Sequence, residues 1–131
     1  MDINSSLTSS YRVYAEDTDF MGIVYHSNYL CFFERARTDF LREIGLPLSL
    51  LATYDCHFAI HTAQLRYLNP ARLEDLLVIT TKIGSISPCS LVFDQNMQKQ
   101  DNTMLCQLKI KIACVNQSLK PKRLPELFIG K

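Results

Sequence analysis

The chain of 131 residues contains no tryptophan, few glycines and no marked excess of charge of either sign. Its 14 lysines and arginines balance 13 aspartates and glutamates, so the net charge is +1. Proteins that bind the phosphates of nucleic acid usually carry a strong basic excess, and we therefore expect no nucleic-acid partner. Since 47% of the residues are hydrophobic and 21% are charged, the composition is typical of a folded globular protein.

Long apolar runs are also missing. No stretch is long and apolar enough for a membrane-spanning helix, and the first ten residues are polar without the basic and apolar regions of a signal peptide. The sequence therefore predicts a cytoplasmic protein with no signal peptide and no membrane span. Its length predicts one domain, covering residues 1–131, with a single core.

The five cysteines are odd in number and widely spaced, and they include no C-x-x-C pair of the kind that binds zinc. They are predicted to be reduced and mostly buried, and we expect neither a metal nor a redox cofactor. Cys56 lies next to His57, which leaves a catalytic thiol as an alternative. Neighbours on a strand point to opposite faces of the sheet, however, so adjacency alone does not create a Cys/His pair.

An amphipathic helix is predicted over residues 28–44. Apolar side chains recur there at steps of three and four: Tyr29, Phe33, Ala36, Phe40 and Ile44. Ser27 or Asn28 suits the N-cap, and Gly45 followed by Pro47 marks the end of the helix.

Alternating apolar and polar residues predict the strands. After a loose start at residues 1–10, we expect strands at residues 11–16, 57–67, 76–86, 90–98 and 104–116. Short helical turns are predicted at residues 48–54 and 125–129, and turn-forming residues at 69–71, 87–88 and 100–103 favour hairpin-like antiparallel pairing. Because no long helix separates the later strands, the sequence predicts an α+β fold with an antiparallel sheet packed on the helix.

One segment, from Glu16 to Tyr29, concentrates polar groups next to the predicted helix start. Taken singly, Asp17 and Asp19 suit turns, and His26 suits a partly buried ring that donates a hydrogen bond. Taken together, they place a carboxylate beside a helix N-terminus, whose unpaired N–H groups can stabilise negative charge on a carbonyl oxygen. Because such a carboxylate can attack the carbonyl or activate water, the segment predicts acyl transfer to water without a serine nucleophile or a metal.

Several motifs of the chain point to a known family. They are Tyr14-Ala15-Glu16-Asp17-Thr18-Asp19, Gly22-Ile23-Val24-Tyr25-His26, Asn28-Tyr29-Leu30, Phe33-Glu34-Arg35-Ala36-Arg37 and the segment from Tyr67 to Asp75. Together they resemble the signature of the hotdog-fold acyl-CoA thioesterases, and more narrowly of the 4-hydroxybenzoyl-CoA thioesterase family and its tol-pal-associated branch. The resemblance covers nearly the whole chain. It implies a hotdog fold, in which a five-stranded antiparallel sheet wraps around one long central helix.

The resemblance also implies an activity, the hydrolysis of acyl-CoA to a free carboxylic acid and coenzyme A. The second aspartate of the family's D-x-D-x-x-G motif is the catalytic carboxylate, which maps onto Asp19 as nucleophile or general base. His26 is the second expected catalytic residue, because its backbone N–H would polarise the thioester carbonyl and its ring would help to position substrate or water. Gly22 and Tyr25 are expected to bind substrate, Gly22 because a missing side chain lets the thioester approach the backbone.

Coenzyme A would be part of the substrate rather than a cofactor, and its phosphates need cations. The candidates are Arg66, Arg72 and Arg123, together with Lys120 and Lys122. An acyl carrier protein is a further candidate partner. Hotdog domains pair edge to edge with active sites between subunits, so we expect a homodimer or homotetramer, which would also cover an exposed sheet edge.

The chain departs from the branch pattern in two places. Ala15 stands where relatives often carry tyrosine, and Phe20 and Met21 stand where small residues are common. We expect Phe20 and Met21 to narrow the acyl pocket or make it more apolar. The main alternative function is a non-catalytic module that binds acyl-CoA or acyl carrier protein. A hotdog dehydratase is disfavoured because the chain has no H-F-P-G-type segment.

Overall fold

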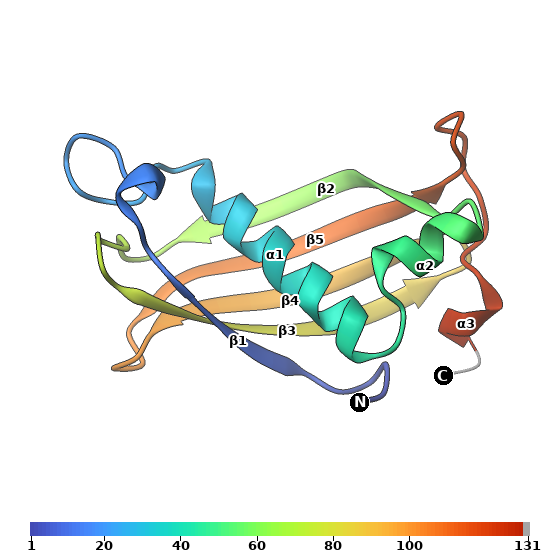
Figure 1. Ribbon diagram of the computed structural model, residues 1–131, viewed down its shortest axis with the longest axis horizontal. Coiled ribbons are helices and arrows are strands. Elements are labelled where there is room, and N and C mark those ends of the chain that lie inside the picture. The colour runs from blue at the N-terminus through green and yellow to red at the C-terminus, as the bar shows by residue number, and fades with distance from the viewer. Residues whose placement is uncertain (130–131) are drawn as a thin grey trace.

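The computed structural model describes residues 1–129 and contains one five-stranded antiparallel sheet that curves around a long helix (Figure 1). The strand order is β1-β3-β4-β5-β2. The strands are β1 (Leu7–Arg12), β2 (His57–Tyr67), β3 (Leu76–Ser87), β4 (Ser90–Lys99) and β5 (Met104–Val115). The helix, α1 (Asn28–Glu43), lies across the concave side of the sheet. The predicted α+β class is therefore confirmed.

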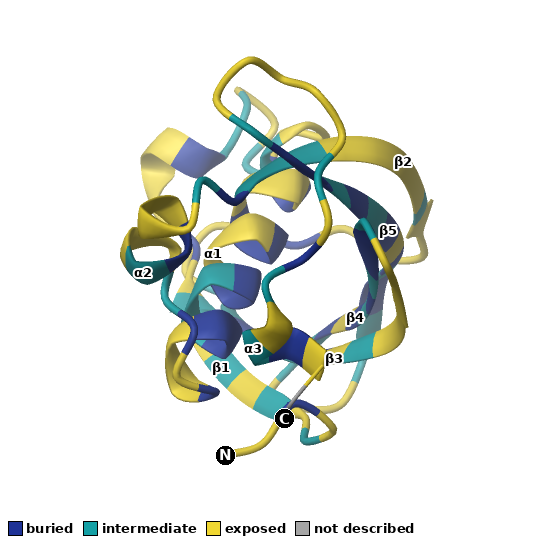
Figure 2. Cartoon of the chain, turned by 90° about the vertical axis from the view of Figure 1, so that its right-hand side faces the viewer, coloured by how far each residue is buried: buried dark blue, intermediate teal, exposed yellow. Residues whose placement is uncertain are grey.

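The apolar face of α1 forms the centre of the core, and Figure 2 shows its buried side turned toward the sheet. The five positions predicted for this face are each at most 4% exposed: Tyr29, Phe33, Ala36, Phe40 and Ile44. Gly45 follows with a φ of 84°, and the Leu46 N–H donates to the Leu41 carbonyl oxygen at 2.8 Å. A glycine in the left-handed region thus ends the helix, as predicted.

The first strand lies earlier than predicted. β1 begins at Leu7, inside the segment expected to be loose, and it pairs with β3 along its whole length. After Arg12 the chain leaves the sheet and forms a 3₁₀ turn, η1 (Ala15–Asp17), in which the Asp17 carboxylate accepts a hydrogen bond from the Tyr14 N–H at 2.8 Å. The predicted strand over residues 11–16 was therefore largely wrong. The two serines of β1 do not favour a strand by themselves, and β3 supplies the hydrogen-bonding partners of β1.

The other elements occur where predicted, to within one residue at each end, including the short helices α2 (Leu48–Thr53) and α3 (Glu126–Ile129). The β3–β4 and β4–β5 pairs are hairpins as expected, but β2 pairs with β5 and not with β3. The break at residues 69–71 therefore starts a crossover, because a turn signal marks where a strand ends but not which strand it joins. None of the helices within residues 1–129 combines the length and apolarity needed to span a bilayer.

All five cysteines are free thiols, and three of them are buried: Cys56, Cys106 and Cys114. Cys31 is exposed and Cys89 is half-buried. The prediction that the thiols are mostly buried is confirmed, and their reduced state stays a prediction. Burial raises the pKa of Cys56 and of Cys106 from 9.0 to about 12.

Because the pKa of both thiols is raised in the folded chain, we expect the protein to lose stability at alkaline pH. The unfolded chain releases their protons near pH 9 and the folded chain near pH 12, so the free energy of unfolding should fall between these values and stay unaffected by them at lower pH. Urea denaturation at a series of pH values should show a shallower alkaline fall for Cys106→Ala than for the control Cys31→Ala. Equal slopes in the two variants would contradict this.

A second prediction concerns the core. Phe33 is fully buried on α1, so Phe33→Ala should lower the free energy of unfolding by about 3–5 kcal/mol. Leu30→Ala, on the same helix but 36% exposed, should have a much smaller effect. Chemical denaturation of both variants measures the difference, and similar losses would show that the α1 face is not the centre of the core.

Candidate active site

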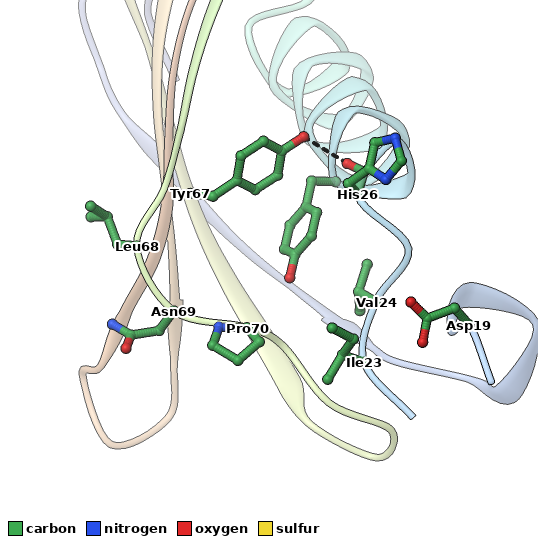
Figure 3. A pocket seen from close by; sticks show the side chains of 9 residues that line it. Asp19, Ile23, Val24, His26, Tyr67, Leu68, Asn69 and Pro70 are labelled. Carbon is green, nitrogen blue, oxygen red and sulfur yellow. Dashed lines mark hydrogen bonds between the residues drawn. The ribbon is translucent and has the colours of Figure 1, made fainter. Parts of the chain in front are cut away.

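A pocket of about 330 Å³ opens beside the N-terminal end of α1 (Figure 3). One side is formed by the β1–α1 loop through Asp19, Ile23, Val24 and His26. The other side is formed by α1, the end of β2 and the loop that follows, through Tyr29, Tyr67, Leu68, Asn69 and Pro70. The two residues predicted to be catalytic, Asp19 and His26, therefore line the same largely apolar pocket.

A tight turn holds Asp19 in position. The Asp19 N–H donates to the Ile23 carbonyl oxygen, and the Gly22 N–H donates to the Asp19 carbonyl oxygen, both at 3.0 Å. The carboxylate oxygen Oδ1 accepts from the Met21 N–H at 2.8 Å, and no donor within residues 1–129 bonds to Oδ2. Figure 3 shows the carboxylate directed toward Val24 and the pocket.

Gly22 is required by the shape of this turn. Its φ of 77° lies in the left-handed region that side chains rarely adopt. A Cβ atom added at this position would meet nothing within 4 Å, so crowding inside the chain is not the reason for the glycine. The glycine shapes the turn that carries Asp19, and a direct contact between its backbone and substrate stays a prediction.

The start of α1 has no side-chain cap. Ser27 occupies the N-cap position with helical backbone angles, φ −75° and ψ −19°, and makes no capping hydrogen bond. The Asn28 side chain donates instead to the Asp17 carbonyl oxygen at 3.0 Å. Ser27 is therefore the N-cap residue, as predicted, but the capping hydrogen bond typical of that position is absent. Within residues 1–129 the N–H groups of His26 and Ser27 have no acceptor. They and the positive end of the helix dipole are available to a ligand oxygen.

Two tyrosines join this helix start to the end of β2. The Tyr67 hydroxyl donates to the His26 carbonyl oxygen at 2.8 Å, the dashed line in Figure 3. The rings of Tyr67 and Tyr29 meet edge to face with centroids 5.3 Å apart, and the Tyr29 hydroxyl accepts from the Ala71 N–H at 3.0 Å. Burial raises the pKa of both tyrosines, so their hydroxyls stay protonated at neutral pH.

Other predicted positions lie outside the pocket. Asp17 is a turn former, as its pattern indicated, because its carboxylate closes η1. Tyr25 is 46% exposed, and its ring packs against His26 with centroids 4.3 Å apart. Phe20 is 100% exposed and Met21 70% exposed, and neither lines the pocket. The expectation that they narrow it is wrong for the pocket of a single chain, since the tight turn presents both side chains to solvent.

The cations predicted to bind phosphates do not gather in one place. Arg72 does not line the pocket, but its backbone forms a bridge with that of Ile23, which does. Arg66 is exposed on β2 and lines a separate hollow with residues of β4 and β5. At the other end of the sheet, Arg123 lies near Cys114, in the same C-terminal segment as Lys120 and Lys122. Within one chain, these cations do not form a common phosphate site.

Sequence reasoning gives no site role to Tyr29, Tyr67 or Asn69, although all three line the pocket. Tyr29 fits the apolar face of a helix and Tyr67 the end of a strand, so local pattern assigns each a structural place. The motif Tyr67-Leu68-Asn69-Pro70, which belongs to the family resemblance, is the signal that could have identified two of them.

The chemistry of the pocket follows from its donors and acceptors. The described part of the chain has no group of three or more His, Cys, Asp or Glu side chains arranged to hold a metal ion. The pocket instead combines the Asp19 carboxylate with the unpaired N–H groups of His26 and Ser27. A carbonyl bound between them would find hydrogen-bond donors for its oxygen and a base or nucleophile for its carbon. This arrangement suits the hydrolysis of an ester or thioester.

Comparison with known proteins agrees with this geometry. Residues 13–129 match the family model described as the thioesterase-like superfamily. The chain is 39% identical over 120 residues to the acyl-CoA thioester hydrolase YbgC of Escherichia coli O157:H7. The matched residues cover 91% of this chain and 90% of that protein. It is 38% identical over 117 residues to the acyl-CoA thioesterase YbgC of Haemophilus influenzae, with 88% and 85% covered.

A solved structure shares the same architecture. The probable thioesterase from Bartonella henselae aligns with a TM-score of 0.87 and 36% identity, covering 92% of this chain and 100% of that one. The resemblance inferred from the motifs and the hotdog fold that it implied are both confirmed. The chain therefore belongs to the thioesterase-like superfamily and has its hotdog fold.

Proposed function

We propose that this protein hydrolyses acyl-CoA thioesters to a free carboxylic acid and coenzyme A. The observation that carries the proposal is the meeting of Asp19 and the uncapped start of α1 in one largely apolar pocket. The YbgC relatives are named as acyl-CoA thioester hydrolases, which favours a thioester of coenzyme A over other esters.

The proposed reaction places the thioester carbonyl oxygen against the N–H groups of His26 and Ser27. As a general base, Asp19 takes a proton from water while the water oxygen bonds to the carbonyl carbon. The C–S bond then breaks, and the thiolate leaves and takes up the proton that Asp19 received. As a nucleophile, Asp19 would displace the thiolate to form an anhydride, which water then cleaves. Both routes give the acid and the thiol.

We propose that the acyl group binds against the apolar walls of the pocket. Ile23, Val24, Leu68 and Pro70 supply apolar surface, so the acyl group would lie against them with the coenzyme A portion extending toward solvent past Arg72. The reaction proposed here uses no cofactor, and coenzyme A takes part only as substrate and product. An acyl carrier protein in place of coenzyme A and a cytoplasmic location both stay predictions.

We also propose that two chains form a homodimer by joining their sheets along β2. This 11-residue strand lies at the edge of the sheet, and within residues 1–129 it pairs only with β5. Ile60 is 62% exposed and Tyr67 51% exposed on it, and the open backbone groups of an edge strand favour pairing with another strand. The pocket lies at the end of β2, so it would border the second subunit. Two such dimers would give the expected homotetramer.

The first activity prediction concerns Asp19. Asp19→Asn removes the base or nucleophile, so thiol release from acyl-CoA should fall by at least about a hundredfold. A matched control, Glu16→Gln, changes an exposed carboxylate of the same loop and should keep activity near the wild-type level. Thiol release is measured across a panel of acyl-CoA chain lengths and aromatic acyl groups.

Two results would overturn the proposal. Turnover that survives Asp19→Asn would exclude Asp19 as the reacting carboxylate. Saturable acyl-CoA binding by the wild type without thiol release from any member of the panel would favour the non-catalytic binding module.

The second activity prediction concerns Tyr67, which holds the His26 carbonyl and so orients the peptide that carries the Ser27 N–H. Tyr67→Phe keeps the ring contact with Tyr29 but removes this hydrogen bond. We expect kcat to fall by about tenfold with KM little changed, because the loss affects the groups that face the reacting carbonyl. Steady-state kinetics test this, and an increase in KM at unchanged kcat would argue for a simple contact with substrate.

A further inference from the structure

Arg37 is a charged residue in the buried face of α1, with only 8% of its surface exposed. Its Nη1 donates to Oε1 of Gln95 at 3.0 Å. Gln95 is 1% exposed and donates in turn to the Phe33 carbonyl oxygen and the Thr81 hydroxyl, each at 3.0 Å. Gln95 therefore holds the guanidinium in place but, being neutral, does not compensate its charge. Burial lowers the pKa of Arg37, in keeping with surroundings that disfavour a cation.

The charge of Glu34 in the same chain partly offsets the effect of burial on the pKa of Arg37, but no carboxylate within residues 1–129 forms an ion pair with this cation. Within residues 1–129 the three ion pairs involve other cations: Arg42, His57 and Lys99. Glu34 lies one helical turn before Arg37 and is exposed, yet the two side chains form no ion pair. A mostly buried cation without an ion pair is unfavourable, so a carboxylate in direct contact with Arg37 is expected from outside the chain.

Arg37 and Glu34 both line a second pocket, of about 370 Å³, which shares no residue with the Asp19 pocket. It lies between α1, α2 and the first half of β2, with Phe58 and Ile60 among its apolar residues. Ile60 is 62% exposed, so the pocket is bordered by the same open edge that the proposed dimer uses. A cation and a carboxylate thus stand beside an uncovered strand.

Arg37 and Glu34 lie beside the first half of β2. α1 and β2 run in opposite directions, with Tyr29 packed on Tyr67 at one end and Arg37 beside Ile60 toward the other. Glu34 lies between Tyr29 and Arg37 on the helix and lines the second pocket with Phe58 and Ile60 of β2. If two β2 strands pair antiparallel, the two-fold axis passes near the middle of the strand, and residues beside it face their symmetry mates.

We propose that a second copy of this chain supplies the missing carboxylate, with Glu34 of each copy pairing with Arg37 of the other across the two-fold axis. A two-fold interface is self-complementary, so one such contact requires its reciprocal and both buried cations are neutralised together. The inference rests on the proposed β2 dimer and adds the contact that selects its partner. A small anion in the pocket would compensate Arg37 but would leave Glu34 unpaired beside it, so the second copy accounts for both residues.

The test exchanges charges between copies. Glu34→Arg and Arg37→Glu each bring like charges together in a homodimer, so each variant alone should dimerise poorly. In a mixture of the two, one copy carries two arginines and the other two glutamates, and both cross-pairs are restored. Native mass spectrometry of the equimolar mixture should show nearly all dimers as heterodimers, against about half for random pairing.

A matched control and a milder variant complete the test. Asp39 and Arg42 form an ion pair of 2.9 Å within one copy and line a different hollow of α1, beside Tyr11. Asp39→Arg mixed with Arg42→Asp should pair at random. Glu34→Gln changes an exposed side chain that folding does not require, and it should raise the dimer dissociation constant in analytical ultracentrifugation by at least about tenfold.

Three results overturn the inference. The first is random pairing in the mixture of Glu34→Arg and Arg37→Glu. The second is a preference for heterodimers in the control mixture as strong as that in the test mixture. The third is a Glu34→Gln dimer with the same dissociation constant as the wild type. Each of these leaves the β2 dimer and the proposed thioesterase activity intact. A monomeric wild type overturns the dimer and the inference together, while thiol release, measured separately, still decides the activity.

Discussion

The fold depends on the burial of one face of α1 against a single curved sheet. The helix and the five strands share one core, so the position of α1 on the sheet decides where its N-terminus emerges (Figure 1). It emerges next to the end of β2, where the β1–α1 loop meets the β2–β3 loop. The Val24 N–H donates to the Ala71 carbonyl oxygen at 2.8 Å, which ties the two loops together. The turn that carries Asp19 is thereby fixed against the helix start, and the pocket forms between them.

Elements with one buried side could be predicted from the sequence alone. Burial on one side imposes a period of 3.6 residues on α1 and of two on β5, and both periods remain visible in the chain. Gly45 could likewise be placed, because a left-handed residue at a helix end is a local requirement. For the site, residue pattern indicated the segment from Glu16 to Tyr29, and the family resemblance was needed to select Asp19 over Asp17.

Features that depend on distant neighbours could not be predicted in this way. β1 is a strand because β3 pairs with it. β2 lies at the sheet edge because it pairs with β5 and not with β3, the strand that follows it in the chain. Arg37 reads as one of several charged residues on a helix, and only the folded chain shows that it is buried beside Gln95. The link between Tyr67 and His26 joins residues 41 positions apart, and no local pattern marks it.

Tyr67 belongs both to the open edge of the sheet and to the pocket. The end of an edge strand, which has a neighbour on one side alone, opens more readily than the middle of a sheet, and a strand on its other side would hold it in place. The Tyr67 hydroxyl bonds to the carbonyl oxygen of His26, next to the unpaired N–H groups of His26 and Ser27. A second strand that fixed the end of β2 would therefore also fix the position of these N–H groups. Catalytic competence would then be a property of the assembled protein more than of the isolated chain, and turnover per chain would rise with protein concentration.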